Sequence, residues 1–170
     1  MHIIVTGTPG TGKTTVAKMI SLNLGHKYID VNELIKQHNI CDEYDKERMC
    51  TIVDADKLKK ILDKLIKLSK EPLIIDSHMS HVISSKLIGL CIVTRCELKV
   101  LKQRLEQRGY SEQKVRENLD AEIFENCLTE AQENEHNVQV IDTTKLKEKP
   151  LIEQIKKWIA WTLQNLRSQP

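Results

Sequence analysis

The sequence lacks the features that mark membrane, secreted and disulfide-bonded proteins. Its 170 residues contain no run of about 18 apolar residues, so we expect no membrane-spanning helix. The chain passes from Met1 directly into a strand-like stretch at residues 2–6, without a charged and then apolar leader, so no secretory signal is expected. The five cysteines are an odd number and include no Cys-x-x-Cys pair, which favours reduced thiols in a cytoplasmic protein over disulfides or a zinc knuckle.

Aromatic residues and an excess of one charge are also scarce. Aromatic residues make up 4% of the chain, with a single Phe, so the core must consist mainly of Ile, Leu and Val. The 26 Lys and Arg residues are nearly balanced by 24 Asp and Glu residues. Domains that bind nucleic acid by bulk charge are usually far more basic, so we expect no direct binding of this kind, although a local basic cluster stays possible.

The apolar residues alternate between short continuous runs and helical spacing. Runs rich in β-branched residues that end in a polar or glycine-containing turn occur at 2–6, 73–76, 89–94 and 138–142. Apolar residues three and four positions apart recur at 58–66, 98–105 and 115–127, and a last helix is predicted from Pro150, with Trp158 and Trp161 packed on the body. The alternation predicts an α/β fold of three layers, a parallel sheet flanked by helices, in one domain at 1–170.

Residues 7–14 read Gly-Thr-Pro-Gly-Thr-Gly-Lys-Thr and match the phosphate-loop pattern Gly-x4-Gly-Lys-Ser/Thr at every required position. The match lies between a predicted strand and a predicted helix, as this loop requires. Glycines let successive backbone N–H groups point at phosphate oxygens, and the helix adds the positive end of its dipole. Lys13 is expected to reach the β- and γ-phosphates, and the Thr14 hydroxyl to bind Mg²⁺. The sequence therefore predicts a site for a nucleoside triphosphate.

Two further patterns supply groups for phosphate chemistry. The apolar run 73–76 ends in Asp76, which is expected to bind the Mg²⁺ through water, although an Asp at a strand end is also a common turn former. Arg104 and Arg108 stand four positions apart near the end of a predicted helix, so both guanidinium groups project from one side and suit phosphate oxygens. A solvated arginine pair would show the same spacing. Gly109 then breaks the helix and allows a lid to move.

Longer stretches resemble one family. The loop at 7–15, the run Arg-Leu-Glu-x-Arg-Gly-Tyr at 104–110, and the stretches Glu-Asn at 117–118 and Ala-Glu-Ile-Phe at 121–124 resemble the adenylate kinase isoenzyme 6 family, which archaea and eukaryotes share. The resemblance covers nearly the whole chain and implies a P-loop NTPase fold of the nucleoside monophosphate kinase type with a short lid. It also implies γ-phosphate transfer from ATP to AMP, slower ATP hydrolysis, and binding of the small-subunit ribosomal protein uS11 during 16S or 18S rRNA maturation.

The resemblance also assigns residues. The implied ATP contacts are Gly7, Gly10, Thr11, Gly12, Lys13, Thr14, Thr15 and Arg108. A monophosphate-binding segment is implied at about 30–53, with Asp30 and Lys36 in contact with the acceptor, and a lid at about 107–117. Asp76 and His78 match the family's Asp-x-His, which is linked to ATP hydrolysis and ribosome maturation; by its chemistry alone, His78 orients a water or a phosphate, or is structural. The expected catalytic residues are Lys13, Asp76, His78, Arg104 and Arg108.

The chain departs from the family pattern in two places. Lys36 stands where members often have Arg, and a lysine cannot make the bidentate fork, so the strength of AMP binding stays open. The residues Met79, Ser80 and His81 replace the Gly-Cys-Asp of eukaryotic members, and His81 has no assigned role. The polar segment 39–48 lacks periodicity and is predicted to be an exposed loop, whose acidic residues could also contact a basic ribosomal protein.

Three functions stay open at this point. The leading hypothesis is an adenylate kinase that converts ATP and AMP to two ADP. The alternative is an ATP-driven ribosome assembly factor that binds uS11 and phosphorylates AMP only incidentally. A third is a small-molecule kinase such as shikimate kinase, which places Asp-x-Asp after its second strand, where this chain has Asp-Val-Asn at 30–32. If the protein acts on pre-ribosomes, its few placed cations predict docking through a basic protein rather than through RNA.

Overall fold

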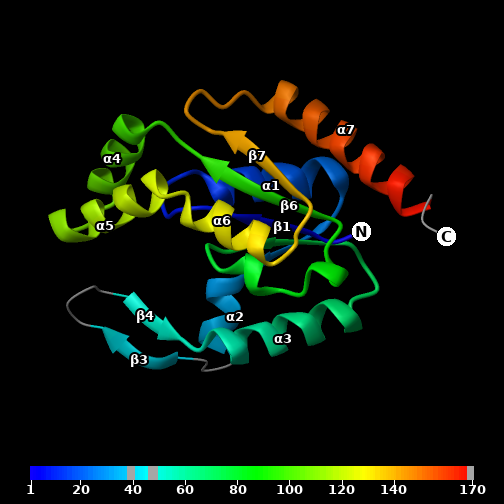
Figure 1. Cartoon of the computed structure of the whole chain (residues 1–170), viewed down its shortest axis with the longest axis horizontal. Helices are drawn as coiled ribbons and strands as arrows, with labels where there is room; N and C mark the ends of the chain where they lie inside the picture. Colours follow the sequence, from blue (N-terminus) through cyan, green and yellow to red (C-terminus); the bar gives the residue numbers. More distant parts are fainter. Residues whose placement is uncertain (38–40, 46–49, 168–170) are drawn as a thin grey trace.

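Five short runs rich in Ile, Leu and Val form the central sheet of the computed structural model, which describes residues 1–37, 41–45 and 50–167 (Figure 1). The strand order is β2-β5-β1-β6-β7, and every neighbouring pair is parallel. The strands are β1 (Ile3–Thr6), β2 (Lys27–Asp30), β5 (Leu73–Asp76), β6 (Leu90–Arg95) and β7 (Val138–Asp142). The antiparallel pair β3 (Cys41–Asp45) and β4 (Cys50–Val53) lies apart from this sheet. The predicted parallel α/β fold is confirmed.

Helices cover both faces of the sheet because neighbouring strand residues point to opposite sides. The helices are α1 (Lys13–Leu24), α2 (Val31–Gln37), α3 (Ala55–Leu68), α4 (Leu98–Gln107), α5 (Glu112–Ile123), α6 (Asn126–Glu133) and α7 (Glu148–Arg167), with short 3-10 turns η1 (Ser80–Val82) and η2 (Ser85–Leu87). Ile3 and Val5 pack with α1 and α7, whereas Ile4 packs with α2, α3 and α6 (Figure 1). Helices α4 and α5 share a smaller apolar cluster beyond the end of β6. The phosphate loop follows β1 at the end of the sheet that faces this cluster.

Four details differ from the expected elements. Strand β2 was not among the predicted runs, because it lies at the sheet edge and its residues are only partly buried. The predicted loop at 39–48 is wrong for Cys41–Asp45, which pairs with β4 through backbone hydrogen bonds that need no apolar periodicity; the rest of that segment lies outside the described residues. The helix predicted at 115–127 is interrupted after Ile123, where Glu125 adopts a φ of 54°. Trp158 packs on the core as expected, but Trp161 is 57% exposed.

Membrane insertion has no support from the described helices. None of them combines the length and the apolar character that a bilayer crossing requires.

The second position after the end of helix α6 has a backbone conformation that favours glycine. Glu135 has a φ of 57°, and the backbone N–H groups of Glu135 and His136 close the helix on the carbonyls of Gln132 and Ala131. A side chain in this left-handed conformation costs about 1–2 kcal/mol, which glycine avoids. We therefore expect Glu135→Gly to raise the free energy of unfolding by about 1 kcal/mol in chemical denaturation. Glu135→Ala is the matched control, since it removes the same charge but keeps the Cβ; an equal gain there would contradict the backbone explanation.

Candidate active site

The phosphate loop joins β1 to α1 and takes a shape that requires glycine. Gly7 has a φ of 138°, and a Cβ at this position would lie 2.5 Å from the carbonyl oxygen of Thr94. Gly12 caps the start of α1 with a φ of 89°. Backbone N–H groups at such a helix start form a site for phosphate oxygens. The loop geometry is therefore built into the strand-to-helix connection.

Hydrogen bonds from within the loop and from a distant strand brace this shape. The Thr11 hydroxyl donates to the Thr8 carbonyl at 2.7 Å, and the Lys13 ammonium donates to the same oxygen at 3.0 Å. The Thr143 hydroxyl, just after β7, donates to the Thr11 carbonyl. Thr143 was not predicted, because nothing in the local sequence indicates a contact across 132 positions. A ligand that takes up Lys13 would replace an internal hydrogen bond with one to phosphate.

A cavity of about 420 Å³ in front of this loop gathers six of the predicted site residues. Its lining includes Lys13, Thr14, Lys36, Asp76, His78 and Arg108, which come from α1, α2, the end of β5 and the end of α4. Asn32, Tyr110 and Lys114 complete its polar wall. Asp30 is not part of the lining; its carboxylate accepts the N–H of Asn32 at 2.8 Å, at the start of α2. Any contact of Asp30 with an acceptor stays a prediction.

Asp76 is held at the end of β5 by a partner that the sequence did not indicate. The carboxylate is 3% exposed, and its Oδ2 accepts a hydrogen bond from the Tyr28 hydroxyl at 2.9 Å. Burial raises the pKa of Tyr28, and the bond to Asp76 raises it further, so Tyr28 remains a donor. Parallel pairing places Asp76 opposite Val5 on β1 and opposite Asp30 on β2. The carboxylate thus lies beside the strand that leads into the phosphate loop.

Two of the basic side chains that line the cavity, Lys13 and His78, have lowered pKa values. Removal from water lowers the pKa of Lys13 to about 8, although the carboxylate of Asp76 acts in the opposite direction. The side chain of His78 opens to the cavity, yet the surrounding protein lowers its pKa to about 4, helped by the positive charge of Lys13. At neutral pH His78 is therefore an uncharged imidazole, which can accept as well as donate a hydrogen bond.

Arg104 and Arg108 lie near each other but have different surroundings. Arg104 donates to the Gly10 carbonyl at 3.4 Å and to the carbonyl oxygen of Thr143 at 3.0 Å. It lines a second cavity, of about 340 Å³, that also includes Gly10, Gly12, Thr15 and Arg108. Arg108 lines both this cavity and the larger one. Arg108 therefore lies where a triphosphate bound along the loop would pass, and Arg104 contacts the loop itself; their roles toward ATP stay predictions.

A buried carboxylate connects the phosphate loop to helix α5. Glu122 is 5% exposed, its Oε2 accepts a hydrogen bond from the Thr8 hydroxyl at 2.6 Å, and its Oε1 accepts one from the Cys96 N–H at 3.0 Å. Glu122 belongs to the Ala-Glu-Ile-Phe stretch at 121–124, but its role was not apparent from that stretch. The first half of α5 belongs to the predicted lid at 107–117, so a displacement of the lid can reach the loop through this side chain.

The residues present fit a magnesium ion shared with phosphates. Thr14 and Asp76 line one cavity and offer the hard oxygen donors that Mg²⁺ prefers. Within the described ranges, no group of three or more His, Cys, Asp and Glu residues is arranged to hold a metal. Mg²⁺ in phosphoryl-transfer sites typically takes one or two protein oxygens together with substrate phosphates and water. The expected site therefore needs the nucleotide as a ligand.

The parallel sheet, the phosphate loop and the cavity define the class: this is a P-loop kinase fold. Among solved structures, shikimate kinase from Acinetobacter baumannii with bound shikimate has a TM-score of 0.66, 16% identity, and coverage of 94% of this chain and 92% of that one. A gluconokinase from Sinorhizobium meliloti 1021 has a TM-score of 0.58, 16% identity, and coverage of 99% and 97%. At such identity the likeness concerns the fold alone.

Sequence comparison identifies the family. Residues 3–125 match the family described as AAA domain. The putative adenylate kinase of Methanocaldococcus jannaschii is 39% identical over 155 residues, which cover 91% of this chain and 84% of that protein. The adenylate kinase isoenzyme 6 homolog FAP7 of Saccharomyces cerevisiae is 33% identical over 170 residues, which cover 99% of this chain and 85% of that protein. The chain belongs to the adenylate kinase isoenzyme 6 family, as the resemblance indicated.

Proposed function

We propose that this protein is an adenylate kinase that transfers the γ-phosphate of ATP to AMP and yields two ADP. The observation that carries the proposal is the 420 Å³ cavity, because it joins donor-side groups of the phosphate loop with Lys36 and Asn32 of α2. The names of the relatives support a nucleoside monophosphate as acceptor. The segment at 30–53 then serves as the acceptor-binding part, and 107–117 as a short lid.

The chain's own groups can perform this transfer by placing and neutralising the phosphates. Phosphoryl transfer needs little covalent chemistry from the protein, so the work is alignment and charge stabilisation. With a pKa of about 8, Lys13 is mostly protonated at neutral pH, and Arg108 adds a second fixed cation. Thr14, and Asp76 through water, would hold Mg²⁺, which neutralises phosphate charge when bound. Lys36 supplies a point charge for the acceptor phosphate.

Water competes with AMP as the acceptor of the γ-phosphate. The lid at 107–117 consists only of the short connection between α4 and α5 and the first half of α5, so its closure excludes water incompletely. The neutral imidazole of His78 lines the cavity beside Lys13 and can orient a water molecule or a phosphate oxygen. We therefore infer a slower ATPase activity beside the kinase activity.

An acceptor panel tests the proposal. AMP, CMP, UMP, dAMP and shikimate are each offered with Mg·ATP, and phosphorylated product is measured directly by chromatography. We expect AMP to be phosphorylated well above the other acceptors and shikimate not at all. Failure of every monophosphate would contradict the adenylate kinase proposal, and phosphorylation of shikimate alone would assign the protein to the small-molecule kinases.

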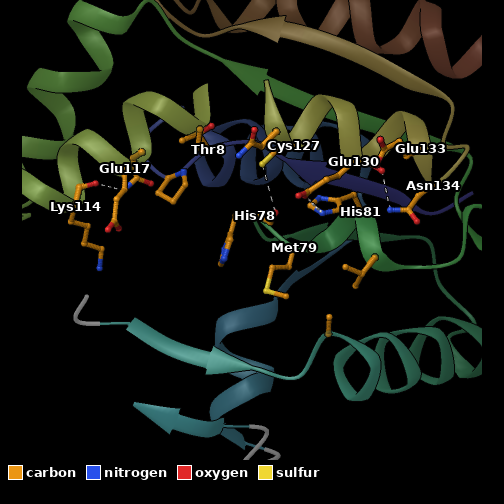
Figure 2. A pocket seen from close by; sticks show the side chains of 16 residues that line it. Thr8, His78, Met79, His81, Lys114, Glu117, Cys127, Glu130, Glu133 and Asn134 are labelled. Atoms are coloured by element: carbon orange, nitrogen blue, oxygen red, sulfur yellow. Dashed lines mark hydrogen bonds and ion pairs between the residues drawn. The ribbon is translucent and has the colours of Figure 1, made fainter. Parts of the chain in front are cut away.

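An ATP-driven assembly role with uS11 is the second candidate. It is supported by a groove of about 670 Å³ beside the phosphate loop, whose lining includes Glu117, Glu130 and Glu133 and which suits a basic protein segment (Figure 2). Titrating AMP into an ATPase assay separates the two roles. A stoichiometric rise in ADP supports the kinase, whereas stimulation by uS11 alone supports assembly. Tight binding of RNA without a partner protein would contradict docking through a basic protein.

We also infer a cytoplasmic location. Cys91, Cys96 and Cys127 are free thiols, and burial raises the pKa of each. Buried thiols with raised pKa values are chemically inert and suit a reducing compartment.

A further inference from the structure

His81 occupies a buried position between helix α6 and β1, the strand that leads into the phosphate loop. Its side chain lies in η1 at the floor of the 670 Å³ groove and is 5% exposed (Figure 2). The ring Nε2 lies 2.7 Å from Oε2 of Glu130, and the ring Nδ1 lies 3.1 Å from the Thr6 hydroxyl. The Thr6 hydroxyl also lies 3.2 Å from the carbonyl oxygen of His78, to which it can donate. A path of hydrogen bonds therefore runs from Glu130 through His81 and Thr6 to the backbone of His78.

The path ends on the two pieces of chain that carry the predicted chemistry. Thr6 is the last residue of β1 and directly precedes Gly7 of the phosphate loop. The carbonyl of His78 belongs to the segment that also carries Asp76. The Ser77 N–H and the Ser80 hydroxyl already bind the loop after β5 to the Val5 carbonyl, and the Thr6–His78 hydrogen bond adds a third connection at His78 itself.

This path of hydrogen bonds has two states, which differ in the protonation of His81. A Glu130 carboxylate only accepts, so Nε2 of His81 must carry a proton. In the neutral ring Nδ1 is then an acceptor, and it competes with the His78 carbonyl for the one proton of the Thr6 hydroxyl. In the charged ring Nδ1 also carries a proton and donates to Thr6, which leaves the Thr6 proton for His78. All three hydrogen bonds form together only when His81 is protonated.

The surroundings favour the neutral ring at neutral pH. Burial lowers the pKa of His81, while Glu130 acts in the opposite direction. Around it, His136 donates from Nε2 to the His81 carbonyl at 2.9 Å, the Cys127 thiol of α6 lies 3.9 Å from the His78 carbonyl, and Lys59 of α3 donates to the neighbouring Val82 carbonyl. Burial also lowers the pKa of His136, so this neighbour is uncharged as well. At neutral pH, Nδ1 of His81 and the His78 carbonyl therefore compete for the proton of the Thr6 hydroxyl.

We propose that His81 is a positioning residue for phosphoryl transfer: with Glu130 as its partner, it decides through Thr6 whether the carbonyl of His78 is fastened to the end of β1. This inference rests on the proposed kinase function. In the fastened state His78 stands in place before the nucleotide arrives, and transfer is faster. Protonation of His81 favours that state, so kcat contains a component that rises as pH falls below the usual histidine range.

The variant Glu130→Gln separates this role from a merely structural one. Unlike a carboxylate, the introduced amide can donate to Nε2, which allows a neutral His81 to carry its proton on Nδ1 and donate to Thr6; this tautomer is favoured because every donor then has its own acceptor. The Thr6 proton is then free for the His78 carbonyl at every pH. A structural ion pair would instead lose activity or stability on this change. Because the Glu130 side chain is 52% exposed, the variant is expected to fold.

The pH dependence of kcat provides the first test. We compare the wild type, Glu130→Gln, Thr6→Val and the control Glu153→Gln, an exposed residue of α7, from about pH 5 to pH 8, and divide each kcat by that of the control to cancel titration of the substrates. At neutral pH we expect Glu130→Gln to exceed the wild type about fivefold, the weight of one net hydrogen bond, and to lose the His81 titration. Thr6→Val is expected to have a low kcat that does not change as His81 titrates. Equal or slower transfer by Glu130→Gln at neutral pH would overturn the proposal.

The tautomer of His81 gives a readout that needs no activity. Long-range ¹H–¹⁵N spectra of the labelled protein report which ring nitrogen is protonated. At neutral pH we expect Nε2–H in the wild type and Nδ1–H in Glu130→Gln. An Nδ1–H ring in the wild type would overturn the proton count. If both tautomers are as expected but no monophosphate is phosphorylated, the kinase function has failed and not the hydrogen-bond path.

Discussion

Lys13→Ala is expected to lower kcat/KM for AMP phosphorylation about 10³-fold, the largest effect of any change considered for this protein. The Lys13 ammonium already lies against the Thr8 carbonyl at 3.0 Å and lines the transfer cavity, so its loss removes a preorganised cation from the developing charge. After loss of the Lys13 side chain the Thr8 carbonyl still accepts from Thr11, and the Asp76 carboxylate still accepts from the Tyr28 hydroxyl. The variant should therefore fold, and initial-rate kinetics with Mg·ATP measure the effect.

Lys102→Ala is the matched control for this substitution. Lys102 lies on the exposed side of α4, where its ammonium is 3.8 Å from Glu106 and 58% of its side chain is exposed. Surface ion pairs contribute little, so we expect near wild-type kinetics. Full AMP phosphorylation by Lys13→Ala under the same conditions would show that the loop at 7–14 does not bind the donor as proposed.

Asp76→Asn is expected to lower kcat about 10²-fold and to raise the Mg²⁺ concentration needed for half-maximal rate. The amide is nearly the same size and can still accept the Tyr28 hydroxyl, so packing at the end of β5 is preserved. What disappears is the negative charge that a metal-bound water would face. The rate is measured across an Mg²⁺ titration at saturating ATP and AMP.

Tyr28→Phe distinguishes charge from orientation at the same carboxylate. It removes the 2.9 Å hydrogen bond to Oδ2 but keeps the charge of Asp76, so we expect a loss of less than about tenfold and an unchanged Mg²⁺ requirement. If Asp76→Asn left the Mg²⁺ requirement of the enzyme unaltered, the placement of Asp76 beside the metal would be wrong.

Contiguous patterns account for what the sequence predicted well. The phosphate loop is one uninterrupted stretch whose glycines answer local backbone needs, such as the φ of 138° at Gly7. The run 73–76 is fully buried and therefore shows as an unbroken apolar strand. Edge strand β2 and the hairpin of β3 and β4 lack such a pattern, since partial burial and backbone pairing leave little trace in residue type.

Contacts between distant residues explain what was missed. Helical spacing correctly put Arg104 and Arg108 near each other, but it could not show that Arg104 is engaged with the Thr143 carbonyl. Glu122, Tyr28 and His81 act through partners 114, 48 and 75 positions away. Each looks ordinary in its own stretch of sequence, because a buried polar group is defined by its partner and not by its neighbours.

The hydrogen bond from Thr143 to Thr11 affects when, during synthesis, the phosphate loop can reach its final structure. The phosphate loop is synthesised before Thr143, which follows β7 and lies 132 positions beyond Thr11. Long-range contacts of this kind form only after the intervening chain has been arranged. A nascent chain therefore displays the complete Gly-x4-Gly-Lys-Thr motif before the hydrogen bond that braces its Thr11 carbonyl can form.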